Sequence, residues 1–120
     1  MSEETRRPSK KIKLILSDLH LGRGRLMADG SMNTFEEFYF SDKLVEFIQF
    51  YSSGAFRECD VEIIFNGDFL NFLQVDYRGH FLTTITESIS IEVLKSIVNG
   101  HLQVFKAMGD FLSQPYRKIT

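Results

Sequence analysis

The chain has 120 residues, 43% of them hydrophobic, which suits one folded domain with a core and excludes a wholly disordered chain. Its formal net charge of −2 gives no electrostatic indication of a nucleic-acid partner. The single cysteine excludes an internal disulfide, and no segment approaches the roughly 20 apolar residues of a membrane span. Without a signal peptide, these features predict a cytoplasmic protein with no transmembrane segment.

The first predicted element is a short strand at residues 11–17, after a flexible polar tail at residues 1–10. An apolar run of this length, bounded by polar residues, fits the interior of a sheet. Its apolar residues are Ile12, Leu14, Ile15 and Leu16. Asp18 and His20 follow where the strand ends, and two residues apart in an extended chain they would face the same side. Together they form a candidate half of a metal site.

A loop and a helix are predicted next. Residues 21–33 are rich in Gly, Arg and small polar residues, which is typical of a loop, and they include Arg23 and Arg25. An apolar pattern of helical period then begins after Ser41, which we expect to be the N-cap, with Gly54 as the stop.

A second buried strand is predicted at residues 61–65, and it runs into an Asn-Gly-Asp sequence at 66–68. The long helical connection between the two strands predicts a parallel βαβ unit, and hence the α/β class. Because parallel strands end at the same edge of a sheet, we expect Asp18, His20 and Asp68 to converge. Mixed Asp and His ligands suit Mn, Fe, Zn or Ni better than Ca.

The C-terminal part of the sequence predicts two helices and the start of a third strand. Thr84 and Glu87 have the spacing of a capping box ahead of a helix that ends near Gly100. A second helix is expected over residues 102–112, and residues 117–120 are typical of a strand.

Taken singly, each polar motif has an ordinary structural explanation, since Asp-x-His arises by chance and Gly-Asp is a common turn. Their pairing at two strand ends is more specific. The sequences SDLHLG at 17–22 and NGDFLN at 66–71 resemble the first two motifs of the calcineurin-like metallophosphoesterases. The surroundings are similar to members of the UDP-2,3-diacylglucosamine diphosphatase type. This resemblance implies a four-layer α/β/β/α sandwich with parallel strands and crossover helices, of which residues 11–120 would form the N-terminal portion.

The resemblance also implies a function. Asp18 and His20 would bind the first of two divalent metal ions, and Asp68 would bridge both. A phosphate mono- or diester, or a pyrophosphate, would be hydrolysed by a hydroxide bound to the dinuclear centre; no catalytic residue besides the ligands is assigned. The family's third motif, Gly-Asn-His, is absent, and Asn99-Gly100-His101 has the wrong order. We therefore expect the 120-residue chain, apparently truncated before that motif, to be inactive alone and to expose a sheet edge that favours self-association.

Four residues are candidate substrate contacts: Arg23, Arg25, Asn71 and His80. Guanidinium groups pair well with phosphate, although solvated loop arginines are an equal interpretation of the first two. Asn71 is expected to have a supporting role only. His80 and His101 are expected to be surface or loop histidines rather than metal ligands.

A different class of function is also open, namely a non-catalytic scaffold of the same fold that serves protein interaction. The presence of Asp18, His20 and Asp68 argues against it, because a scaffold needs no ligand set. Nucleic-acid hydrolysis by the same metal chemistry has no support from the acidic charge balance.

Overall fold

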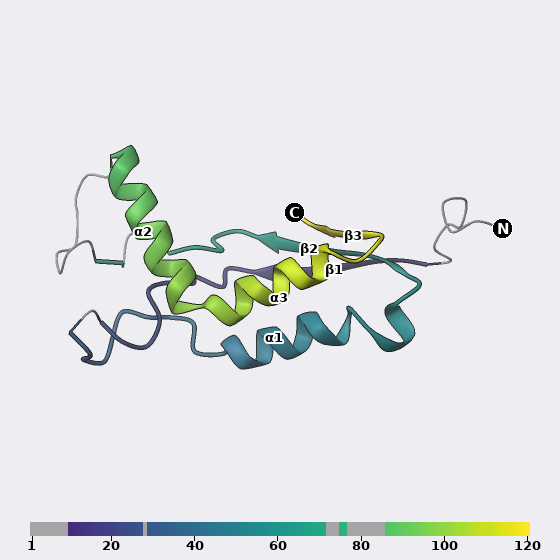
Figure 1. Cartoon of the computed structure of the whole chain (residues 1–120), viewed down its shortest axis with the longest axis horizontal. Helices are drawn as coiled ribbons and strands as arrows, with labels where there is room; N and C mark the ends of the chain where they lie inside the picture. Colours follow the sequence, from purple (N-terminus) through teal and green to yellow (C-terminus); the bar gives the residue numbers. More distant parts are fainter. Residues whose placement is uncertain (1–9, 28, 72–74, 77–85) are drawn as a thin grey trace.

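The computed structural model describes residues 10–27, 29–71, 75–76 and 86–120. Within them lie a three-stranded sheet, three α-helices and one short 3-10 helix (Figure 1). The strands are β1 (Lys11–Ser17), β2 (Asp60–Asn66) and β3 (Arg117–Ile119). The helices are α1 (Ser41–Phe50), η2 (Gly54–Phe56), α2 (Glu87–Gly100) and α3 (Leu102–Leu112). The predicted tail, Thr84 and His80 lie outside the described residues, except for Lys10 at the end of the tail.

The sheet is parallel throughout, with β2 between β1 and β3, so the expected α/β class is confirmed. Lys11 lies opposite Asp60 and Ser17 opposite Asn66, so β1 and β2 are in register over their whole length. Helix α1 lies in the connection from β1 to β2, and α2 and α3 lie in the connection from β2 to β3. As predicted, residues 102–112 are helical and the chain enters a third strand at Arg117.

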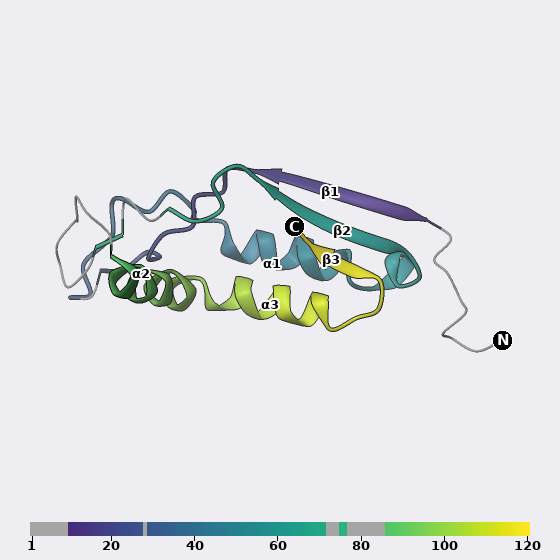
Figure 2. The ribbon, with the colours of Figure 1, turned by 90° about the horizontal axis from the view of Figure 1, so that it is seen from above.

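Helices α1 and α3 pack on one face of the sheet, and α2 extends beyond the carboxyl ends of the strands (Figures 1 and 2). The core forms where β2 meets these helices, and its most buried side chains include Val61, Ile63, Ile48 and Phe111. The prediction that β1 is a buried strand in the interior of the sheet was wrong. Its residues alternate between exposed and half-buried, and Ile15 is 64% exposed, because β1 is an edge strand with helices on one face.

The ends of α1 differ from the prediction. Ser41 is the first helical residue and Phe40 occupies the N-cap, with no side-chain capping bond. The hydroxyl of Ser41 instead lies 2.8 Å from Nδ1 of His101, a tertiary contact that local sequence cannot indicate. The helix ends at Phe50, four residues before the predicted stop at Gly54.

Helix α2 begins at a different cap from the one expected. Thr86 is the N-cap, and its Oγ1 accepts a hydrogen bond from the backbone N–H of Ile89 at 3.3 Å. The helix ends at Gly100 as predicted. Within the described residues, we find no helix with the length and apolarity that a membrane crossing requires.

Arg117 ties the start of β3 to the segment before β2. Its guanidinium donates to the carbonyl oxygens of Phe56 at 2.7 Å and Cys59 at 2.6 Å. It also lies over the ring of Phe111, 5.7 Å from the centroid. Desolvation at this partly buried position lowers the pKa of Arg117 below its usual value. The short third strand is thus held by side-chain contacts as well as by its ladder to β2.

Candidate metal centre

The loops that follow β1 and β2 run side by side beyond the strands and continue their hydrogen-bonded ladder. The first bond joins Asp18 N–H to the carbonyl of Asn66 at 2.9 Å. The second joins His20 N–H to the carbonyl of Asp68 at 3.0 Å, and Leu21 bonds to Phe69 at 2.8 Å. Because the backbone of one loop is bonded to the other, the side chains at these positions are held on a common frame.

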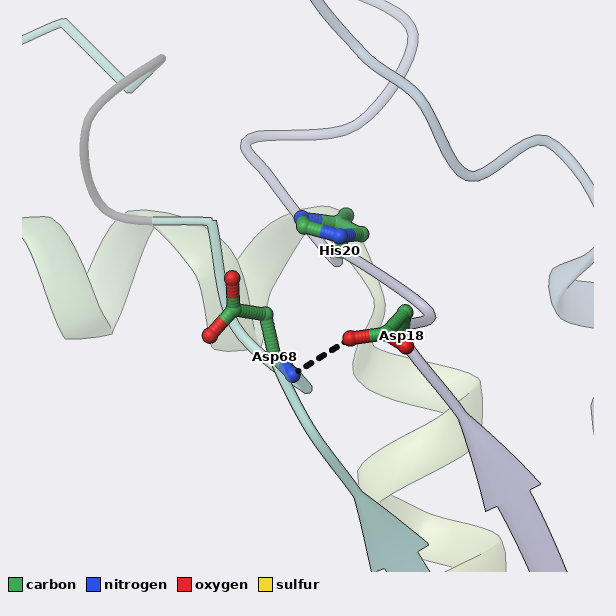
Figure 3. Close-up of side chains that lie close together, drawn as sticks. All are labelled: Asp18, His20 and Asp68. Atoms are coloured by element: carbon green, nitrogen blue, oxygen red, sulfur yellow. Dashed lines mark hydrogen bonds between the residues drawn. The ribbon is translucent and has the colours of Figure 1, made fainter.

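Asp18, His20 and Asp68 converge on this frame, as expected from the parallel strands (Figure 3). One ligand atom from each lies within 4.8 Å of the other two; the carboxylates are exposed and His20 is half-buried. Ligand atoms that share one ion through bonds of about 2.2 Å lie at most about 4.4 Å apart. Small side-chain rotations would therefore bring all three atoms into one coordination sphere, so these residues fit a divalent transition metal.

The backbone at the first two ligands is not extended, contrary to the prediction. Asp18 has φ 51° and His20 has φ 54°, and both values lie in the left-handed region. Strand β1 ends at Ser17, so the alternation of a strand does not bring the two side chains together. Such conformations are costly for residues other than glycine and concentrate at functional sites, where the surrounding structure holds them in place.

Gly67 makes room for the Asp18 carboxylate. It has φ +79°, and a Cβ built on it would overlap Oδ1 of Asp18. The same oxygen accepts a hydrogen bond from the backbone N–H of Asp68 at 3.0 Å, drawn as the dashed line in Figure 3. The Gly-Asp sequence after β2 thus has two roles. Gly67 leaves space for the carboxylate of Asp18, and Asp68 is itself a candidate ligand.

Replacing Gly67 by alanine tests this arrangement. We expect Gly67→Ala to lower the free energy of unfolding by about 1–2 kcal/mol for the left-handed backbone alone, and further because Asp18 must move. Displacement of Asp18 should also weaken Mn²⁺ binding, measured by the EPR signal of the free ion. The matched control is Gly54→Ala, at φ +60° with no atom within 4 Å of its built Cβ. Equal Mn²⁺ affinity in the two variants would contradict the role assigned to Gly67.

A fourth polar side chain adjoins the centre, and the sequence reasoning missed it. Oε2 of Glu37 lies 3.8 Å from Nδ1 of His20, and both side chains are partly exposed. A carboxylate beside a metal-binding histidine commonly fixes the orientation of the ring. No local pattern marks Glu37, because it comes from the loop before α1.

The two predicted arginines contact residues other than the three candidate ligands. Arg23 donates to Oγ of Ser96 at 3.3 Å and pairs with Asp76 at 3.4 Å, and the Asp76 side chain is 2% exposed. Arg25 donates to the carbonyl of Tyr39 at 3.3 Å. Both arginines line a cavity of about 740 Å³ that none of the three candidate ligands lines. Its other lining residues include Ser41, Asp42, Ser96, Asn99 and His101.

The charges around this cavity bear on the substrate-contact hypothesis. Arg23 is already paired with a buried carboxylate, so less of its charge is available to a phosphate group. The remaining candidates are not tested by the geometry: the backbone N–H of Asn71 donates to the carbonyl of Leu21 at 2.8 Å, and His80 lies outside the described residues.

The expectation that His101 is a surface or loop histidine holds for its place in the connection between two helices, but the surface position was wrong. It is 3% exposed and joins the end of α2 to the start of α3. Its Nε2 lies 2.6 Å from Oε1 of Glu36, another buried residue that the sequence reasoning did not single out. Tertiary packing decides this burial, because the local sequence around His101 is no different from that of a solvated helix connection.

Comparisons of the chain with protein-family models, with curated proteins and with solved structures find no match. The likeness to the calcineurin-like metallophosphoesterases therefore rests on the two motifs at residues 17–22 and 66–71.

Proposed function

We propose that the intact protein is a metal-dependent phosphoesterase that hydrolyses a phosphate mono- or diester or a pyrophosphate. Asp18 and His20 would hold one divalent ion, and Asp68 would lie between that ion and a second. The two motifs resemble those of the calcineurin-like metallophosphoesterases. On the basis of this resemblance, we also propose that residues 11–120 belong to a four-layer α/β/β/α sandwich.

The observation that carries the proposal is the convergence of Asp18, His20 and Asp68 at the carboxyl ends of β1 and β2. Two carboxylates and an imidazole, each offering one ligand atom within 4.8 Å of the others, form a set that could hold a metal ion. The left-handed backbone at Asp18 and His20 adds support, because strain of this kind is typical of functional sites.

When bound there, divalent ions such as Mn, Fe, Zn or Ni would supply Lewis acidity toward phosphate oxygens and a nucleophile from water near neutral pH. The protein's own part is positional. Asp68 contributes a carboxylate oxygen within 4.8 Å of a ligand atom of each of the other two residues. Its backbone N–H holds Asp18 through one oxygen and leaves the other oxygen for a cation. Three side chains cannot fill the coordination of two ions, so further ligands are needed for full activity.

Two measurements test the proposal. We expect the 120-residue chain to bind at most one Mn²⁺ ion, weakly, and to hydrolyse bis(p-nitrophenyl) phosphate feebly or not at all. We expect the intact protein to hydrolyse it with Mn²⁺ and to lose that activity with EDTA. Absence of Mn²⁺ binding by both forms would reject the metal centre. Metal binding by the intact protein without turnover of any phosphate ester would favour the scaffold function instead.

A further inference from the structure

A buried polar network links the loop after His20 to the corner between α2 and α3. Glu36 is 4% exposed, and both of its carboxylate oxygens lie 3.0 Å from the backbone nitrogen of Gly22. Nε2 of His101 lies 2.6 Å from the same carboxylate, and Nδ1 lies 2.8 Å from Oγ of Ser41. The chain of contacts therefore runs from α1 through His101 and Glu36 to a residue two positions after a candidate metal ligand.

The donors and acceptors of this network can be assigned from its partners. Gly22 N–H can only donate, so the carboxylate of Glu36 accepts, and it accepts again from Nε2–H of His101. In a neutral imidazole Nδ1 then accepts from the hydroxyl of Ser41. A buried carboxylate is costly unless hydrogen-bonded in this way, so neither Glu36 nor His101 is readily replaced.

The loop is held at three consecutive residues. Gly22 is bonded to Glu36, and a Cβ built on Gly22 would lie 2.5 Å from Oε2 of that side chain. The backbone of Arg23 lies against Gly100, where a built Cβ would overlap the carbonyl oxygen of Arg23. The carbonyl of Gly24 accepts from Nδ2 of Asn33 at 3.0 Å. This close fit leaves the loop little freedom immediately after His20.

We propose that Glu36 and His101 are positioning residues for the metal centre, an inference that rests on the proposed function. His20 has φ 54°, a conformation that a histidine keeps only where its surroundings enforce it. The ladder to Asp68 holds the N–H of His20, and Glu36 holds Gly22 on the C-terminal side. Fixing both sides directs the imidazole toward Asp18 and Asp68, and His101 keeps the Glu36 carboxylate oriented for that task.

The first test compares the same substitution at a buried and an exposed glutamate. In Glu36→Gln an amide nitrogen, which cannot accept, replaces one of the two oxygens that accept from Gly22 N–H. At least one of these contacts is therefore lost, together with the negative charge. We expect Mn²⁺ affinity of the folded 120-residue chain, measured by EPR of the free ion, to fall about 10- to 100-fold, as for other outer-shell partners. The control, Glu46→Gln on the exposed side of α1, should bind as the wild type does. A purely structural role would lower the melting temperature of Glu36→Gln and leave its Mn²⁺ affinity unchanged.

The second test asks whether a donor toward Glu36 restores the site. The amide of His101→Gln can still donate to the carboxylate, whereas His101→Leu cannot. We expect His101→Gln to recover most of the Mn²⁺ affinity that His101→Leu loses. Equal loss in both variants would overturn the positioning role of His101.

A measurement without metal separates this inference from the proposed function. In metal-free Glu36→Gln, we expect the backbone amide signals of Gly22 and His20 in ¹H–¹⁵N spectra to shift, while signals of the distant strand β3 stay in place. If the wild type binds Mn²⁺ and Glu36→Gln binds it equally well, the positioning role is wrong and the metal centre stands. If neither the wild-type 120-residue chain nor the intact protein binds Mn²⁺, the proposed function fails, and an unshifted His20 signal then overturns the positioning role as well.

Discussion

Asp68→Asn should abolish metal binding while leaving the fold intact. We expect its Mn²⁺ affinity to fall by at least about 100-fold, because losing a ligand costs more than losing an outer-shell partner. The backbone N–H of residue 68 still donates to Asp18, and the removed charge lies at an exposed position. The free energy of unfolding should therefore change by less than about 0.5 kcal/mol. In the intact protein, turnover of a phosphodiester should fall together with the metal content.

A matched control separates loss of a ligand from loss of one negative charge. Asp110→Asn makes the same change on the exposed face of α3, remote in sequence from all three candidate ligands. EPR of free Mn²⁺ should show wild-type binding for this variant. Unchanged metal content and unchanged turnover in Asp68→Asn would refute the assignment of Asp68 as a ligand, and with it the proposed function.

The second large effect is expected at Gly100, where the α2–α3 corner meets the loop that follows His20. A Cβ at Gly100 would overlap the carbonyl oxygen of Arg23 and lie 2.9 Å from the backbone nitrogen of Gly24. Backbone atoms cannot move aside as a flexible side chain does. We therefore expect Gly100→Ala to lower the free energy of unfolding by about 3 kcal/mol, the upper part of the usual overpacking range.

A second glycine provides a control, because its replacement by alanine is expected to raise the free energy of unfolding instead of lowering it. Gly109 lies inside α3, and no atom lies within 4 Å of its built Cβ. Alanine is the better helix former, so Gly109→Ala should raise the free energy of unfolding by about 0.5–1 kcal/mol. Urea unfolding followed by circular dichroism measures both variants. A Gly100→Ala protein as stable as the wild type would show that the loop does not pack against this corner as described.

Much of the architecture could be predicted because it depends on local patterns. Two apolar runs separated by a long helical segment predict parallel strands, and β1 and β2 do pair in parallel. Helix α3 and the end of α2 at Gly100 follow from apolar periodicity and from the glycine. The start of α1 could not be predicted, because the hydroxyl of Ser41 bonds to His101, 60 residues away in the sequence.

The set of chemistry-bearing residues that meet could be predicted from the amino-acid sequence. Asp18, His20 and Asp68 follow strands whose parallel pairing brings their ends together, and pairing depends on apolar runs that are visible in the sequence. How these residues are held could be seen only in the folded chain. The left-handed backbone at His20 and the burial of Glu36 and His101 come from packing between segments distant in the chain. The local sequence does not indicate such contacts, because the same residues would be solvated in a protein where no distant segment packs against them.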